Sequence, residues 1–385
     1  SIDTKVLIMR VVAFCNELID FCKGGSIMIK PSALKKGDAV AIVSLSSGML
    51  GEDFARHELE IGLRRIREFG LEPVVMPNAL RGMKYLQEHP EARAQDLKDA
   101  YYDERIKGII CAIGGDDTFR LLPYIMDDND FISHAKENPK LFTGFSDTTI
   151  NHLMFYKMGI TTFYGPNFVC DLAELDDEML PYTKSFFSKY FAAKDRYSIE
   201  SSDIWYEERT DFSENSVGIP RISHPEKRGH EIIQGSGKVR GRLLGGCLES
   251  FYDILTVNRY ENQKAMCEKY GIFPDLSEWR EKILFLETCE EKPEPEKFRK
   301  ELFSLKETGI FEEVAAVIFG KPADEAFYED YKTIIKEVID DERLPVMYNL
   351  NFGHAYPRCV IPYGLEAELD FDKKTLEVGE SLFGA

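Results

Sequence analysis

The sequence predicts an α/β protein with a parallel, doubly wound sheet in its first half and a second, smaller β-rich α/β domain after it. Apolar strand-like runs alternate with helical patterns between residues 39 and 163, which is typical of a parallel sheet. From Gly235 onward short strands become frequent. The chain has 385 residues, enough for two or three domains.

These patterns divide the chain into four parts. Residues 1–27 are expected to be an extension that forms a helix, because Leu7, Val11 and Cys15 recur four apart. Residues 28–175 form the predicted N-terminal α/β domain, 176–204 a linker with helix, and 205–385 the C-terminal domain. The extension is too short and too charged to span a bilayer.

The amino-acid composition argues against several classes of binding partner and site. The net charge of −19 argues against nucleic acid and anionic membrane as partners, since both require basic surface. The eight cysteines are scattered without a C-x-x-C pair, so neither a zinc site nor a redox motif is indicated. We expect no metal and a reducing, cytoplasmic location.

Five strands and four helices are expected in the first domain, in alternation. The strands are 39–44, 71–77, 108–113, 140–143 and 160–163, and the helices are 54–69, one opening at 90–97, 119–126 and 150–159. The first strand, Ala39 to Ser44, is apolar and β-branched, as buried parallel strands are. Small polar residues follow it, where an α/β sheet usually builds its site.

Ser146 stands between the predicted strand 140–143 and the helix that follows. A serine at such a turn can be lifted to the carboxyl edge of the sheet as a nucleophile, with backbone N–H groups nearby for an oxyanion. The alternative is an ordinary helix cap, because Ser, Asp and Thr are preferred at helix starts.

Gly114 and Gly115 end the third predicted strand. Paired glycines there let the backbone approach a ligand and direct N–H groups at it, although most such pairs are plain turns. Asp116 and Asp117 follow; capping of the next helix is favoured for them over metal binding. Neither a phosphate loop nor a dinucleotide fingerprint is present.

Two residues of the second half complete a catalytic set. Glu287 ends the apolar strand 283–286, and His354 lies in a loop rich in glycine and proline. With Ser146 they supply a nucleophile, a base and an orienting carboxylate. His152 is the rival base, but it lies six residues into the helix, roughly 9 Å from Ser146 along the axis.

Trp205 stands in a polar stretch of the second half. It is a candidate surface for stacking a flat ligand group. The alternative, that it packs on its own domain, is equally consistent with the sequence.

Several motifs resemble the LD-carboxypeptidase family, and in the same order. They are Ile113-Gly114-Gly115-Asp116-Asp117, Gly144-Phe145-Ser146-Asp147-Thr148-Thr149, Tyr164-Gly165-Pro166, Gly245-Gly246-Cys247-Leu248-Glu249, Phe285-Leu286-Glu287-Thr288 and Gly353-His354. The resemblance extends from about Met28 to the C-terminus. The first and fourth motifs are most similar to the microcin C immunity-protein branch, which also carries an aromatic loop in the region of Trp205.

The resemblance implies a flavodoxin-like first domain and a Ser–Glu–His triad of Ser146, Glu287 and His354. It further implies an oxyanion hole from the N–H groups of Gly115 and Asp147. Gly114, Asp116 and Trp205 are the corresponding substrate-binding candidates.

The resemblance also implies a homodimer without metal or organic cofactor. Its substrates would be a peptidyl or aminoacyl nucleotide, or an L,D-amide bond of a cell-wall tetrapeptide. A two-domain receptor that binds an acidic peptide or another carboxylate without chemistry is the alternative from another class. An amidotransferase is disfavoured, because position 146 is serine and not cysteine.

Overall fold

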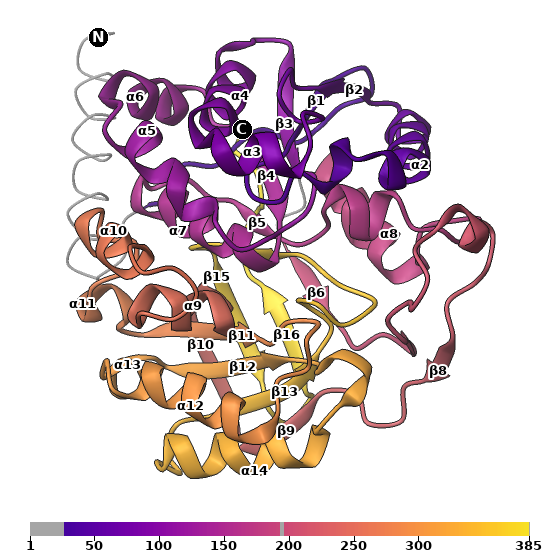
Figure 1. Cartoon of the computed structure of the whole chain (residues 1–385). Helices are drawn as coiled ribbons and strands as arrows, with labels where there is room; N and C mark the ends of the chain where they lie inside the picture. The colour runs from indigo at the N-terminus through magenta and orange to yellow at the C-terminus, as the bar shows by residue number, and fades with distance from the viewer. Residues whose placement is uncertain (1–26, 193–195, 385) are drawn as a thin grey trace, which may run out of the picture.

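The computed structural model describes residues 27–192 and 196–384, so the predicted helix of the extension lies outside the described residues. Two sheets dominate the fold, one in the indigo and magenta half of the chain and one in the orange and yellow half (Figure 1). The predicted architecture, a parallel first sheet followed by a β-rich domain, is confirmed.

The first sheet has six strands in the order β14-β5-β4-β3-β1-β2. Its strands are β1 (Ala39–Val43), β2 (Glu72–Val75), β3 (Ile106–Cys111), β4 (Leu141–Gly144), β5 (Phe163–Tyr164) and β14 (Ile361–Pro362). The five strands of the N-terminal half run parallel in the order 2-1-3-4-5, which is the flavodoxin-like order. The order reverses between β1 and β3, and loops at such a point commonly form the site.

Helices lie on both sides of this sheet (Figure 1). They are α2 (Arg56–Glu68), α3 (Met83–Glu88), α4 (Pro90–Tyr102), α5 (Leu122–Met126), α6 (Asn129–Glu137), α7 (Thr149–Lys157) and α8 (Pro181–Phe187). Short 3-10 turns are η1 (Met49–Gly51), η2 (Asp53–Ala55), η3 (Thr118–Leu121), η4 (Ser146–Thr148) and η6 (Ser188–Phe191), and a π-turn is η5 (Phe168–Leu172). The helices predicted from the apolar patterns correspond to α2, α4, α5 and α7.

The second sheet has eight strands in the order β6-β16-β15-β10-β11-β12-β13-β9. They are β6 (Tyr197–Ile199), β9 (Glu231–Gln234), β10 (Lys238–Cys247), β11 (Lys282–Glu287), β12 (Ala316–Gly320), β13 (Val346–Leu350), β15 (Glu366–Asp370) and β16 (Thr375–Val378). Strands β10 to β13 are parallel and the outer ones antiparallel. This sheet has more strands than the first, although the sequence suggested a smaller second domain.

The remaining elements belong to the second half of the chain. They are α9 (Leu248–Leu255), α10 (Gln263–Lys269), α11 (Leu276–Trp279), α12 (Pro295–Lys306), α13 (Ile310–Glu313), α14 (Tyr328–Ile339), the turns η7 (Glu214–Ser216) and η8 (Ala323–Glu325), and a ribbon of β7 (Ile204–Tyr206) and β8 (Ser223–Pro225). Within residues 27–192 and 196–384, every helix falls short of the length and apolarity needed to cross a membrane.

The two halves are joined by more than one connection. After the second sheet has received β13, the chain returns to the first sheet as β14, where Ile361 pairs with Tyr164 of β5. The C-terminal residues also return there, since Gly384 donates to the carbonyl of Pro31 at 3.0 Å. Buried side chains of both sheets form one continuous hydrophobic core. The carboxyl ends of β4, just before Ser146, and of β11, at Glu287, therefore face the same part of the molecule.

Candidate active site

Ser146 occupies the turn between β4 and α7. Its φ of 72° lies in the left-handed region, which residues other than glycine seldom adopt. The hydroxyl of Thr149, the first residue of α7, donates to the Ser146 carbonyl at 2.7 Å and helps to hold this conformation. A serine held in this way between a strand and a helix has the arrangement of a nucleophile elbow.

Ser146, His354 and Glu287 form a continuous hydrogen-bonded chain. Nε2 of His354 lies 3.0 Å from Oγ of Ser146, and Nδ1 lies 2.8 Å from Oε2 of Glu287. The same carboxylate oxygen accepts the backbone N–H of His354 at 3.1 Å. His354 is 7% exposed and Glu287 only 1%, so both are shielded from water. Three residues predicted from distant stretches of sequence are thus brought together in one chain of contacts.

A second carboxylate, Glu290, also contacts His354. Its Oε2 lies 3.1 Å from Nε2, the nitrogen that faces Ser146, and its side chain is 58% exposed. Burial lowers the pKa of His354, but the charges of Glu287 and Glu290 and the hydrogen bond to Glu287 outweigh burial and raise the pKa to about 9. At neutral pH the imidazolium of His354 therefore predominates, and only the neutral minority can act as a base. The sequence analysis missed Glu290, although it stands three residues after Glu287.

The turn Gly114-Gly115 passes directly beside Ser146. A Cβ on Gly114 would lie 2.7 Å from Cβ of Ser146 and 2.9 Å from its Oγ, so only glycine leaves room. In the described part of the chain, the Gly115 N–H has no acceptor. Asp147 lies in the first turn of η4, where N–H groups have no partner within a helix. Backbone donors at both positions are therefore available beside the hydroxyl.

Asp116 lines a small pocket of about 70 Å³ that adjoins Ser146. Its carboxylate accepts from the guanidinium of Arg259 at 2.9 Å and from the hydroxyl of Tyr260 at 2.8 Å. The structure thus places Asp116 at the edge of the site, with its oxygens engaged by two side chains of the second half.

The predicted capping of the next helix by Asp117 is wrong. The Asp117 carboxylate instead pairs with the buried guanidinium of Arg93 at 2.7 Å. The Asp117 side chain makes no capping hydrogen bond. The start of η3 is instead bonded by Asp147, whose carboxylate accepts the N–H of Thr118 at 2.9 Å. Burial raises the pKa of Asp147 to about 6.

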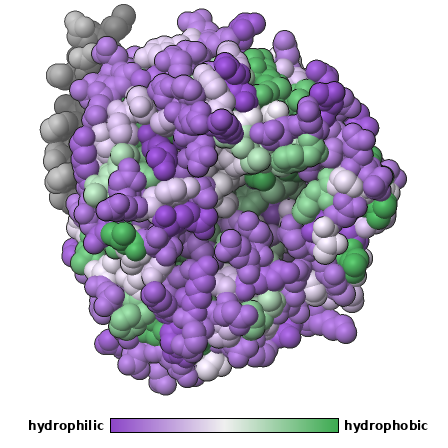
Figure 2. Space-filling view, in the orientation of Figure 1, coloured by the Kyte–Doolittle hydropathy of each residue, from purple (hydrophilic) through white to green (hydrophobic). Residues whose placement is uncertain are grey.

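A larger cavity of about 520 Å³ opens on another side of Ser146. Its lining includes His354 and Gly115 together with the aromatic side chains of Phe54 and Phe212. These two rings are 57% and 43% exposed. The surface view shows a recess partly bordered by hydrophobic residues (Figure 2). A cavity of this volume can hold a small-molecule ligand.

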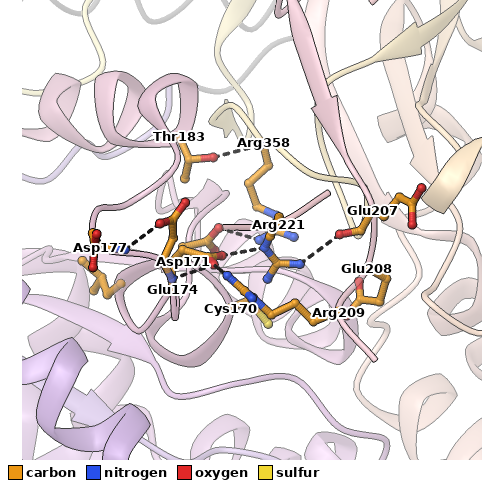
Figure 3. Close-up of polar contacts among 12 residues, drawn as sticks. Cys170, Asp171, Glu174, Asp177, Thr183, Glu207, Glu208, Arg209, Arg221 and Arg358 are labelled. Atoms are coloured by element: carbon orange, nitrogen blue, oxygen red, sulfur yellow. Dashed lines mark hydrogen bonds and ion pairs between the residues drawn. The ribbon is translucent and has the colours of Figure 1, made fainter. Parts of the chain in front are cut away.

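One wall of this cavity is a network of arginines and carboxylates (Figure 3). Glu174, 1% exposed at its side chain, accepts from Arg209 at 2.6 Å and from Arg221 at 2.7 Å. Beside them Arg358 pairs with the buried Asp171. Because each charge has a partner, the wall can be both polar and buried.

Trp205 lies outside the lining of both cavities beside Ser146. Its ring stacks on His224 at a centroid distance of 4.3 Å, and the ammonium of Lys321 lies 5.1 Å from it. A stacking role for Trp205 stays a prediction. Phe212, from the same stretch of chain, lines the cavity and was missed.

His152, the rival base, is turned away from the site. Its ring is buried, with Nε2 2.8 Å from the carbonyl oxygen of Gly144 and Nδ1 2.7 Å from the hydroxyl of Thr162. Burial lowers its pKa to about 3. This histidine supports the strand end that carries Ser146 and does not contact its hydroxyl.

One group of side chains in the described residues could offer ligands to a metal ion. Ligand atoms of Cys247, Glu287 and His354 lie within 4.8 Å of one another. Two of them already hydrogen bond to each other, so a metal ion there would break the contact between His354 and Glu287. Burial and the charge of Glu249 raise the thiol pKa of Cys247 well above its ordinary value, which disfavours the thiolate that a metal needs.

Two protein-family models cover most of the chain. The LD-carboxypeptidase N-terminal domain matches residues 40–165, and the LD-carboxypeptidase C-terminal domain matches residues 240–369. The chain belongs to the LD-carboxypeptidase family. Membership makes it a hydrolase of the serine peptidase type, and it assigns Ser146 to one family domain and Glu287 and His354 to the other.

Relatives within the LD-carboxypeptidase family include the microcin C7 self-immunity protein MccF of Escherichia coli, 30% identical over 75% of this chain and 78% of its own length. A probable murein peptide carboxypeptidase of Bacillus subtilis is 27% identical over 92% of this chain and 97% of its own length. The crystal structure of an MccF-like protein from Streptococcus pneumoniae in complex with AMP is 47% identical, with a TM-score of 0.84 and coverage of 88% and 98%. The similarities to MccF and to the MccF-like protein confirm the predicted MccF-like branch.

Proposed function

We propose that this protein is a serine hydrolase that cleaves the amide bond of a peptidyl or aminoacyl nucleotide and thereby gives resistance to toxins of that kind. The observation that carries the proposal is the hydrogen-bonded chain from Ser146 through His354 to Glu287, whose first two residues line the 520 Å³ cavity. The similarity to an MccF-like protein that binds AMP supports a nucleotide as the leaving side of the substrate.

The chemistry follows from the geometry. Nε2 of neutral His354 takes the proton of Ser146 while Oγ attacks the carbonyl carbon of the amide. Glu287 holds Nδ1–H in place and stabilises the imidazolium that forms. The N–H groups of Gly115 and Asp147 stabilise the negative oxygen of the tetrahedral intermediate. His354 then protonates the leaving nitrogen. In the second half of the reaction His354 takes a proton from water as the water oxygen attacks the acyl carbon, and it returns that proton to Oγ of Ser146 as the acyl–oxygen bond breaks.

The cavity supplies the binding side of the proposal. Phe54 and Phe212 offer exposed aromatic faces for a planar group such as a nucleobase. The arginine network, with Arg209 and Arg221, provides the polar wall. An aminoacyl group would occupy the smaller pocket, which Ser146 and Asp116 both line.

A murein LD-carboxypeptidase is the second candidate, because a relative of similar length carries that description. It would remove the terminal D-amino acid of a cell-wall tetrapeptide with the same three side chains. A carboxylate- or peptide-binding protein without chemistry is the third candidate. It has less support, since binding alone does not require a histidine between a strained serine and a buried carboxylate.

The test offers purified protein an aminoacyl sulfamoyl adenosine and a murein tetrapeptide side by side and follows the products by mass spectrometry. We expect cleavage of the first, and Ser146→Ala should reduce it by about 10³-fold or more while binding persists. Ser304→Ala is the matched control, because its hydroxyl bonds within α12. Cleavage of the tetrapeptide alone would favour the second candidate, the murein LD-carboxypeptidase. Full activity of Ser146→Ala would contradict the assignment of Ser146 as the nucleophile.

Two further expectations belong to this proposal. By analogy with the family, the protein is expected to act as a homodimer in the cytoplasm without metal or cofactor. Sedimentation of the purified protein and activity after dialysis against a chelator would check the oligomeric state and the cofactor requirement.

A further inference from the structure

Tyr164 ends β5 and places its hydroxyl between both ends of the catalytic chain. The backbone N–H of Ser146 donates to the phenol oxygen at 3.1 Å. The phenol O–H in turn donates to Oε1 of Glu287 at 2.5 Å. One hydroxyl therefore contacts the backbone of the proposed nucleophile and the carboxylate that orients His354.

These bonds close a ring of contacts. From Ser146 Oγ the ring passes through His354 to Oε2 of Glu287, and from Oε1 through Tyr164 back to the Ser146 backbone. Tyr164 and Ser146 belong to the first sheet and its turn, whereas Glu287 ends β11 of the second sheet. The ring thus fixes the distance between the two sheets at the site.

The surroundings of Tyr164 leave its hydroxyl little freedom. The residue is fully buried, and its ring lies 5.6 Å from the rings of His152 and Phe285. Burial and the negative charge of Glu287 raise the pKa of Tyr164 well above its ordinary value. The phenol is therefore protonated throughout the working range and remains a donor to the carboxylate.

The bond to Ser146 has a particular use. Ser146 keeps a φ of 72°, and the phenol is the acceptor for its N–H. That N–H is engaged, so it does not contribute to the oxyanion hole, which is left to Gly115 and Asp147. Loss of the phenol oxygen would leave a donor of Ser146 and an acceptor of Glu287 unpaired.

We propose that Tyr164 is a positioning residue for the hydrolysis. Its hydroxyl holds Glu287 against the backbone of Ser146, so that Oγ and Nε2 of His354 stay within hydrogen-bond distance, and it shares the negative charge that Glu287 presents to the imidazole. The inference rests on the proposed function, because it assigns Tyr164 to the same three side chains.

The experiment compares Tyr164→Phe with the wild type on the substrate that the wild type cleaves. The variant should lower kcat by about 10- to 100-fold with KM nearly unchanged, the range that one hydrogen bond to a charged group covers. Without the phenol donor, Glu287 presents more of its charge to His354 and raises the histidine pKa. The acid limb of the kcat/KM profile should therefore move to higher pH.

Other groups near the pair stay in place in both proteins. Those facing His354 and Tyr164 are Glu208, Glu249, Glu290, Cys247, Tyr363, His152 and Arg358. The matched control is Tyr348→Phe, which removes a buried phenol that donates to the carbonyl of Tyr328 at 3.0 Å, on β13 of the second sheet. Its kcat and pH profile should stay near those of the wild type.

The possible outcomes distinguish a failure of the proposed role of Tyr164 from a failure of the proposed hydrolase function. If Ser146→Ala retains full activity, the proposed function fails. If Ser146→Ala is inactive while Tyr164→Phe keeps the wild-type kcat and acid limb, only the role of Tyr164 is overturned. Should the phenylalanine variant not fold, 3,5-difluorotyrosine at position 164 keeps the shape with a stronger donor. Its acid limb should move to lower pH, and an unmoved limb refutes the inference.

Discussion

The contact between Glu290 and His354 gives a sharp prediction for the pH dependence of activity. With a pKa of about 9, His354 is neutral in only about 1% of molecules at pH 7, so the acid limb of kcat/KM should have its midpoint near pH 9 in the free protein. Glu290→Gln removes one negative charge that lies 3.1 Å from Nε2. The histidine pKa should therefore fall, and activity at pH 7 should rise.

The size of the effect follows from the exposure of Glu290. Because its side chain is 58% exposed, water screens the charge. At a dielectric constant of about 80, one unit charge at this distance contributes roughly 1 kcal/mol, or about one pH unit. The neutral fraction of His354 at pH 7 would then rise about tenfold, and kcat/KM with it.

The assay is a kcat/KM profile between pH 5 and 10 for the wild type, Glu290→Gln and Glu268→Gln. Glu268 is the matched control, because its carboxylate, 63% exposed, pairs with Lys264 and lines neither cavity beside Ser146. We expect the midpoint to fall by about one unit only in Glu290→Gln. An unmoved midpoint, or equal shifts in both variants, would refute a direct contact between Glu290 and the base.

Two further substitutions probe space and charge around the site. Gly114→Ala should lower kcat by about 100-fold in a steady-state assay, because the new Cβ would lie 2.7 Å from Cβ of Ser146. The control Gly379→Ala should leave kcat unchanged, because its Cβ would meet no atom closer than 3.8 Å. Asp171→Asn should lower the free energy of unfolding by about 3–5 kcal/mol in urea denaturation, since it leaves the buried Arg358 without its charge partner. Asp53→Asn, at a 99% exposed side chain, should change it by under about 0.5 kcal/mol.

Much of the first sheet could be predicted because local sequence determines it. The run Ala39–Val43 is buried throughout and rich in β-branched residues, and its pattern is that of a central parallel strand. The position of Ser146 after β4 follows from the same logic. The prediction that Glu287 and His354 contact Ser146 depended on the family resemblance, because a carboxylate at a strand end and a histidine in a loop are individually weak signals.

Other parts of the site depend on contacts between distant residues. Tyr164 belongs to a motif that carries the family resemblance, but its contact could not be predicted, because only the docking of β11 brings Glu287 to its hydroxyl. Glu290 belongs to a stretch of surface acids, and its contact with His354 is a matter of loop conformation. Trp205 was singled out by residue type, whereas the ring that lines the cavity, Phe212, has no local signal that separates it from its neighbours.

The path of the chain around His354 explains how a site built from two sheets can keep its geometry. The loop leaves β13 of the second sheet, carries the histidine, and continues into β14, which pairs with β5 of the first sheet.

Within this loop Arg358 donates to the carbonyl of Gly353 at 2.8 Å and pairs with Asp171 of the first half. The histidine is thereby tied to both halves, and the phenol of Tyr164, which joins Ser146 to Glu287, adds a second tie between them. Loosening this attachment by Asp171→Asn should therefore reduce kcat as well as stability. An equal loss of stability in α12 or α14, which lie on the second sheet alone, should leave kcat near the wild-type value.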